Sequence, residues 1–172
     1  MIPRNFLVGL SRAFSTGPSQ VESFRFADMK VEHATELGTP SFDPKDLAFG
    51  HTHTDHMAHV FFDGEKWSNP GIIPFQPIPV DPFNSTLHYG LTCFEGMKAY
   101  WGVDGKIRMI RPWDNMARLS SSMGRLAMDS PWENEELTKV IAELVTKTFS
   151  KPSFWPKFNF HLSKKQLFCL PS

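Results

Sequence analysis

The sequence contains only two cysteines, Cys93 and Cys169, which lie far apart along the chain. Such a pair supports neither a disulfide framework nor a cysteine-rich metal site. An excess of one charge is also lacking, because 18 basic and 18 acidic side chains balance. The net charge therefore gives no indication of nucleic acid or an anionic membrane as a partner. No apolar run approaches the roughly 20 residues that a membrane helix needs, so the composition predicts a soluble globular protein.

Acidic residues are missing from the amino terminus, where none occurs before Glu22. Wound as a helix, this segment places both of its arginines opposite a row of apolar side chains formed by Ile2, Phe6, Leu10 and Phe14. An amphipathic, arginine-bearing segment without acids is typical of a mitochondrial presequence. We expect residues 1–14 to be that presequence, cleaved after Phe14, although an ordinary disordered terminus remains the alternative. An irregular arm is expected over residues 15–48.

The middle of the chain has the patterns of strands. Residues 57–62 are apolar apart from one histidine, and an Asp-Gly pair at 104–105 predicts a hairpin with a type I′ turn. Between these segments, residues 70–82 are rich in proline, so we expect no central strand there.

Two helices are expected after the strands. Pro112 suits a first helical turn, and the apolar face that follows consists of Met116, Leu119, Met123 and Leu126. A capping box of Ser130, Pro131 and Glu133 predicts the start of the second helix, whose apolar residues are Leu137, Val140, Ile141, Leu144 and Val145. Strands followed by helices predict an α+β fold in which an antiparallel sheet carries helices packed on one face.

Candidate metal ligands are concentrated in "GHTHTDHMAHVFF", residues 50–62, which contains four histidines. Imidazoles and a carboxylate suit zinc or a similar cation, so a metal-binding module built on His51, His53, His56 and His59 is one hypothesis. However, the histidines alternate into an apolar strand, and no sulfur or further carboxylate lies nearby in sequence. We therefore assign no metal site and keep the module as a lesser alternative.

The composition changes again at the carboxyl end. No acidic residue follows Glu143, whereas five lysines and many aromatic residues do. Lysines interleaved with rings can bind membranes or nucleic acids. The interpretation favoured here is that residues 147–172 are an aberrant basic and aromatic tail without a folded role, such as translated intron or a shifted frame.

Three stretches resemble the amino-terminal part of branched-chain amino acid aminotransferases. They are "FGHTHTDHM" (residues 49–57), "LHYGLTCFEGMKAY" (87–100) and "IRMIRPWDNMARL" (107–119). The resemblance implies that residues 49–146 are the small amino-terminal domain of a pyridoxal 5′-phosphate enzyme of fold type IV, with the large domain missing. D-amino acid transaminases and aminodeoxychorismate lyases share this fold, but "FEGMKAY" and "RPWDNMAR" favour the branched-chain type.

The resemblance also assigns roles to residues. Arg118 matches the arginine that binds the cofactor phosphate, and Phe49 and Tyr89 match aromatic residues of the substrate pocket. Phe94 either borders the same cavity or belongs to the core. The family transfers the amino group of leucine, isoleucine or valine to 2-oxoglutarate and acts as a homodimer.

The same resemblance places the Schiff-base lysine in the large carboxy-terminal domain. Lys98 matches a different lysine, so this chain contains no catalytic residue of that kind and is expected to be inactive alone, with weak or no cofactor binding. Two alternatives follow: a truncated isoform that acts as an interaction protein, for example by pairing with a complete subunit, or a non-functional fragment.

Overall fold

A computed structural model describes residues 23–37, 53–63, 66–128, 130 and 132–148. The predicted presequence, the histidine at position 51, Phe49 and most of the carboxy-terminal tail lie outside these residues. None of the described helices is long and apolar enough to cross a membrane. In chain order the elements are η1 (Phe26–Asp28), β1 (Lys30–Val31), β2 (His56–His59), β3 (Gly71–Pro74), α1 (Ser85–Tyr89), β4 (Lys98–Trp101), β5 (Ile107–Ile110), α2 (Pro112–Arg125) and α3 (Asn134–Thr148).

The described strands form two small sheets, which makes the fold α+β, as the sequence predicts. A three-stranded sheet has the order β1-β3-β2, and β4 pairs with β5 in a separate antiparallel ladder. The prediction of one antiparallel sheet is wrong, because β1 runs parallel to β3 while β2 runs antiparallel to it. The segment that contains η1 and β1 was expected to be irregular.

The central strand of the larger sheet is β3, which lies inside the proline-rich segment where no central strand was expected. Pro70 precedes the strand and Pro74 is its last residue, so Gly71, Ile72 and Ile73 keep their N–H groups for the ladder. Ile72 is completely buried. Proline at the ends of a short strand is therefore compatible with a central position.

The β4–β5 hairpin forms around the predicted Asp-Gly pair, but its turn is of a different type. Gly105 adopts a positive φ of 73°, while Asp104 is not among the described residues with positive φ. The Gly105 N–H donates to the Gly102 carbonyl at 3.0 Å, and the Gly102 N–H donates to that of Lys106 at 2.8 Å. This pattern is a three-residue loop that ends in a left-handed glycine, rather than a two-residue type I′ turn.

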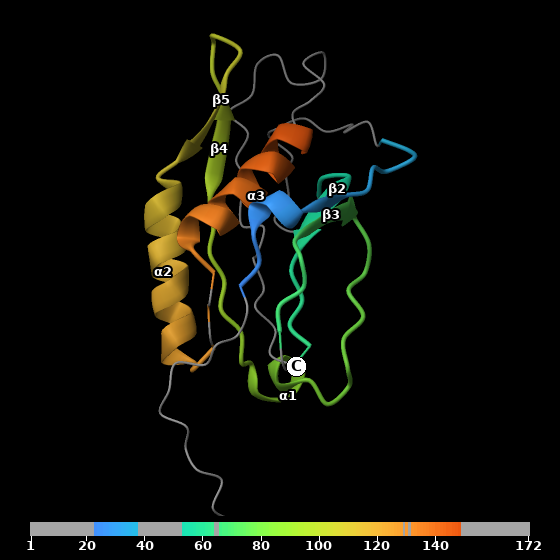
Figure 1. Ribbon diagram of the computed structural model, residues 1–172, viewed down its shortest axis with the longest axis vertical. Coiled ribbons are helices and arrows are strands. Elements are labelled where there is room, and N and C mark those ends of the chain that lie inside the picture. The colour runs from blue at the N-terminus through green and yellow to red at the C-terminus, as the bar shows by residue number, and fades with distance from the viewer. Residues whose placement is uncertain (1–22, 38–52, 64–65, 129, 131, 149–172) are drawn as a thin grey trace, which may run out of the picture.

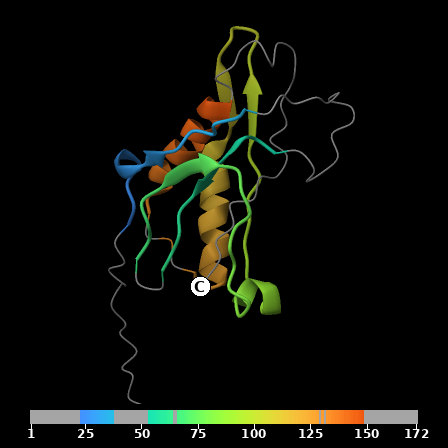
Figure 2. The same cartoon turned by 90° about the vertical axis from the view of Figure 1, so that its right-hand side faces the viewer.

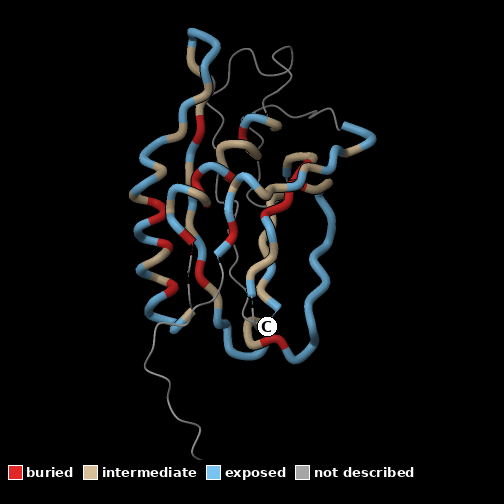
Figure 3. Tube along the Cα trace, in the orientation of Figure 1, coloured by how far each residue is buried: buried red, intermediate tan, exposed pale blue. Residues whose placement is uncertain are grey.

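Helix α3 is the central packing element (Figures 1 and 2). It contacts α2, β2 and η1, and its Val145 packs with Ala99 of β4. The main core joins the two helices to the amino-terminal segment, and its buried residues, shown in red in Figure 3, are Phe24, Cys93, Met116, Leu119, Met123, Trp132, Leu137 and Val140. Most of the predicted apolar face of each helix is thereby confirmed. Leu144 is only half-buried, and Leu126 lies beyond α2 and is partly exposed.

The starts of the two helices follow the sequence to different degrees. Pro112 occupies the first turn of α2, as predicted. Helix α3 begins at Asn134 and not at Pro131, and the Glu133 carbonyl accepts from the N–H groups of Glu136 and Leu137. The first turn of α3 is also tied to the amino-terminal segment, because Glu136 Oε2 accepts from the Phe26 N–H at 2.6 Å.

Candidate functional site

The predicted phosphate-binding arginine, Arg118, lines a cavity of about 200 Å³. The cavity lies where β4, β5 and the first half of α2 meet the chain that leads into β4, and its lining residues are Gly96, Lys98, Ile110, Arg111, Asn115 and Arg118. Two of the motifs that carry the family resemblance, "FEGMKAY" and "RPWDNMAR", thus come together in space around one cavity.

The guanidinium of Arg118 is held by a two-point contact with Glu95. Its Nε donates to Glu95 Oε1 at 2.9 Å, and its Nη2 donates to Oε2 at 2.8 Å. The carboxylate side chain is only 14% exposed, whereas that of Arg118 is 59% exposed. Burial alone would raise the pKa of Glu95, but the hydrogen bonds from Arg118 and Asn115 outweigh it and hold the pKa below its usual value. Glu95 is therefore ionised at neutral pH.

Asn115 completes this contact from one turn earlier on α2. Its side chain is buried, and Nδ2 donates both to Glu95 Oε2 at 2.9 Å and to the Gly96 carbonyl at 2.6 Å. Residues three apart on a helix are neighbours on its surface, so Asn115 and Arg118 can both donate hydrogen bonds to Glu95. The chain at 95–96 is thereby fixed against α2.

The cavity carries a surplus of positive charge. Of its three cations, Arg111 pairs with Asp114 and Arg118 pairs with Glu95. No acidic side chain among the described residues pairs with Lys98, which is exposed. The surplus favours an anionic ligand over a cationic one.

The other predicted site residues do not join this cavity. Tyr89 is the last residue of α1 and is 81% exposed, and it is absent from the cavity lining. Helix α1 ends there because Gly90 takes a left-handed conformation, with φ 64°, and its N–H bonds to the Thr86 carbonyl. Phe94 is also exposed rather than part of the core. Phe49 lies outside the described residues.

The described histidines of this stretch, His53, His56 and His59, make separate contacts. Among the described residues no three His, Cys, Asp or Glu side chains are grouped so as to hold a metal ion. His56 accepts a hydrogen bond from the Ala34 N–H through Nε2 at 3.0 Å, and His53 stacks on Phe75. His59 packs over Gly71, so closely that a side chain there would overlap the imidazole ring. Each described histidine of this stretch therefore has a packing role in or beside β2.

We expect His59 to make the fold sensitive to mild acid. Burial lowers the pKa of His59 below 6.5, and its Nδ1 is buried without a hydrogen-bond partner in the described part of the chain. The unfolded chain then binds more protons than the folded one as the pH falls through about 6.5, so the free energy of unfolding decreases below that pH. Chemical denaturation between about pH 7.5 and 5.5 should show this loss, and His59→Gln should flatten it.

His53→Gln is the matched control, since His53 is exposed and stacks on Phe75. It should retain the acid dependence of the wild-type chain. An unchanged slope in His59→Gln would show that another group causes the loss.

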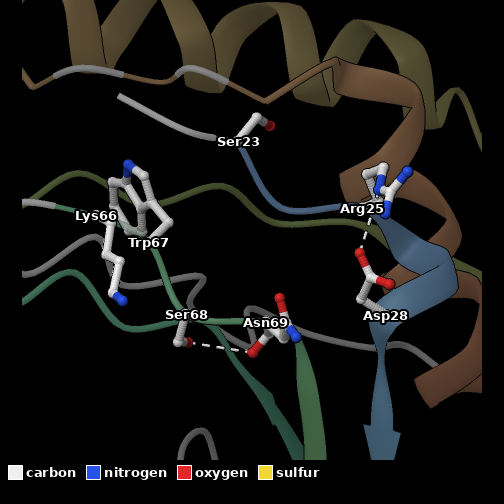
Figure 4. A pocket seen from close by; sticks show the side chains of 7 residues that line it. All are labelled: Ser23, Arg25, Asp28, Lys66, Trp67, Ser68 and Asn69. Atoms are coloured by element: carbon white, nitrogen blue, oxygen red, sulfur yellow. Dashed lines mark hydrogen bonds and ion pairs between the residues drawn. The ribbon is translucent and has the colours of Figure 1, made fainter. Parts of the chain in front are cut away.

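A larger hollow of about 640 Å³ lies beside the amino-terminal segment and is shown in Figure 4. Its lining residues are Ser23, Arg25, Asp28, Lys66, Trp67, Ser68 and Asn69. Arg25 already pairs with Asp28 at 3.1 Å, and none of the residues that carry the family resemblance lines the hollow. The Arg118 cavity is therefore the better candidate for a functional site, despite its smaller size.

Comparison with known proteins agrees with the motifs that surround this cavity. The chain is 40% identical over 127 residues to the cytosolic branched-chain-amino-acid aminotransferase of Caenorhabditis elegans, a match that covers 72% of this chain and 30% of the relative. This chain is homologous to branched-chain amino acid aminotransferases. The mitochondrial enzyme of Bos taurus is 41% identical over 141 residues, covering 81% of this chain and 34% of the enzyme.

A bacterial aminotransferase is similar to the same degree. Branched-chain-amino-acid aminotransferase 2 of Bacillus subtilis is 39% identical over 112 residues, which cover 64% of this chain and 31% of that protein. No family model matches the chain. The chain thus spans about a third of the length of the aminotransferases that it matches, and the family prediction made from the motifs is confirmed.

The sequence did not assign a role at this site to Lys98, Arg111 or Asn115, which line the cavity, or to Glu95, which pairs with Arg118. A signal existed for Asn115, because it directly precedes Met116 on the apolar face of α2 and is buried with it. A polar side chain on a buried helical face needs a hydrogen-bond partner. That need points to a partner without identifying it as Glu95.

Proposed function

We propose that this chain forms the small amino-terminal domain of a branched-chain amino acid aminotransferase, a pyridoxal 5′-phosphate enzyme of fold type IV. Such an enzyme transfers the amino group of leucine, isoleucine or valine to 2-oxoglutarate, giving the branched 2-oxo acid and glutamate. The observation that carries the proposal is the cationic cavity around Arg118, which the two motifs shared with the family build.

The donor set of the cavity fits the cofactor phosphate. A guanidinium has five N–H donors, and Glu95 accepts from only two of its nitrogens, so donors of Arg118 remain for a phosphate. Lys98 adds a charge that no described acid neutralises. Charge-assisted hydrogen bonds to phosphate are the stronger kind, and the planar fork of arginine suits them. When bound, the cofactor supplies the electron sink for amino-group transfer.

Tyr89 and Phe49 are proposed to contribute aromatic surface to the pocket for the branched side chain. In support, Tyr89 lies in an exposed apolar stretch that also includes Phe83, Leu87, Leu91 and Phe94. Apolar area of this kind is typical of surfaces that become covered by ligand or protein. We propose that it lies at the substrate pocket or at the homodimer interface of the complete enzyme.

We further propose import into the mitochondrial matrix, on the basis of the arginine-bearing segment over residues 1–14. Mitochondrial and cytosolic aminotransferases are similar to this chain at nearly equal identity, as the Bos taurus and Mus musculus proteins illustrate. The location therefore rests on the amino-terminal segment alone. Import of the chain into isolated mitochondria, with loss of the segment, would test it.

The affinity of the isolated chain for the cofactor should be low. A hydrogen bond to a charged group contributes about 1.5–3 kcal/mol, whereas even millimolar binding requires about 4.1 kcal/mol. Arg118 therefore needs Lys98 or further groups to reach that level. The Schiff-base lysine and the carboxylate beside the pyridine nitrogen are proposed to come from the part of the family that this chain does not match.

Pyridoxine 5′-phosphate and pyridoxine provide a test that is free of aldehyde chemistry with surface lysines. We expect the phosphate ester to bind the full chain saturably near millimolar concentration, and the alcohol to bind at least tenfold more weakly. Nuclear magnetic resonance titration can measure both affinities. Equal affinities would refute the phosphate site, and transamination of leucine by the isolated chain with added pyridoxal 5′-phosphate would refute its inactivity.

A further inference from the structure

The contact between Arg118 and Glu95 divides the guanidinium into two edges. The edge formed by Nε and Nη2 faces the carboxylate, with one hydrogen bond to each oxygen. The adjacent edge consists of one hydrogen of Nη1 and the second hydrogen of Nη2, and no hydrogen bond from Nη1 is present within the described residues. Since a guanidinium can form a two-point contact along each edge, one arginine can hold a carboxylate and a phosphate at the same time.

The carboxylate is itself held in place by groups other than Arg118. Asn115 donates to Glu95 Oε2 and to the Gly96 carbonyl, and this amide is buried. Helix α2 supplies both Asn115 and Arg118, while Glu95 comes from the chain before β4. The position of the guanidinium is therefore set by a network that crosses between two segments, even though the arginine side chain is 59% exposed.

We propose that Glu95 and Asn115 are positioning residues, which hold Arg118 by one edge so that its other edge is directed at the phosphate of the ligand. This inference rests on the proposed function, because it concerns the same phosphate site. An exposed arginine without such a partner would sample many rotamers, and part of the free energy of phosphate binding would be lost in ordering it. Glu95 removes that cost before the ligand arrives.

Glu95 also has an opposing effect on binding. Its negative charge repels a phosphate and partly neutralises Arg118, so removing it would strengthen binding by charge alone. The two effects predict opposite results for Glu95→Gln. If positioning dominates, the variant binds phosphate more weakly, and if charge dominates, it binds more tightly.

The first measurement needs no ligand. The Nε–H signal of Arg118, identified by its loss in Arg118→Lys, should exchange slowly with water in the wild-type chain, and at least tenfold faster in Glu95→Gln. Glu135→Gln is the matched control, because Glu135 is an exposed glutamate that pairs with Lys139 on α3. If Glu95→Gln fails to fold, a carbon-detected titration of Glu95 in the wild-type chain and in Arg118→Lys decides the same point. The wild-type pKa should then lie below that in the variant.

The second measurement is the affinity for pyridoxine 5′-phosphate. We expect Glu95→Gln to reduce it about tenfold, Asn115→Ala to reduce it by a smaller factor, and Glu135→Gln to leave it unchanged. Equal or tighter binding by Glu95→Gln, or an unchanged Nε–H exchange rate, would overturn the positioning role while the phosphate site remains. If the wild-type chain does not distinguish the phosphate ester from pyridoxine, the proposed function fails, and this inference fails with it.

Discussion

Replacement of Leu119 by alanine should lower the free energy of unfolding by about 2–5 kcal/mol, the usual cost of truncating a fully buried leucine. Leu119 is 1% exposed and lies on α2 between Met116 and Met123, which are equally buried. Across the interface it belongs to the same core as Leu137 and Val140 of α3. The truncation leaves a cavity between α2 and α3. Helix α2 and the β4–β5 hairpin form the candidate site, so the packing of α2 also supports that site.

The loss is large relative to the total stability of a domain, which is about 5–15 kcal/mol. Val103→Ala is the matched control, because Val103 is fully exposed at the tip of the β4–β5 hairpin. Its effect should stay within about 0.5 kcal/mol. Urea denaturation followed by circular dichroism measures both values. If the two variants unfolded at the same urea concentration, α2 and α3 would not pack as described.

The local elements of this fold were predictable because short-range chemistry determines them. The period of Met116, Leu119 and Met123 marks a helical face, and those residues are buried. The Asp104-Gly105 pair likewise locates the hairpin, since the glycine readily takes positive φ. The type of turn was not predictable, because the loop length depends on which residues pair across the strands.

The arrangement of the strands depends on contacts that the local pattern does not contain. The segment from Phe24 onward has no clean period, yet Phe24 is buried against Trp132, with 5.5 Å between the ring centroids. This contact and the bond between Glu136 and the Phe26 N–H hold the segment beside α3. Its strand β1 can then pair parallel to β3, a pairing fixed by tertiary packing rather than by a turn.

At the candidate site, too, the local motif was predictable and the contact between distant segments was not. The motif predicted a site role for Arg118, and the structure places that residue at the cavity. The motif did not reveal that Glu95, 23 residues earlier, holds the guanidinium, since an ion pair between distant segments leaves no periodic signal in one sequence. The exposure of Tyr89 was equally unpredictable, because an aromatic residue at the end of a short helix is consistent with either a core or a surface position.

Arg118→Ala should weaken the binding of pyridoxine 5′-phosphate by roughly tenfold to a hundredfold. A hydrogen bond to a charged group contributes about 1.5–3 kcal/mol, and each 1.4 kcal/mol corresponds to about a factor of ten in affinity. The variant also leaves the mostly buried Glu95 without its cation, so its uncompensated charge repels the phosphate. Both effects act in the same direction, unlike those of Glu95→Gln.

Three comparisons separate these contributions. Arg118→Lys keeps the charge but lacks the two-edged fork, so its affinity should lie between those of wild type and Arg118→Ala. The double variant Arg118→Ala with Glu95→Gln removes the repulsion as well, and it should bind more tightly than Arg118→Ala alone. Arg125→Ala, an exposed arginine at the end of the same helix, controls for the loss of one positive charge from α2. Equal losses in Arg125→Ala and Arg118→Ala would mean that phosphate responds only to the net charge of the helix, and the cavity would then have no specific role.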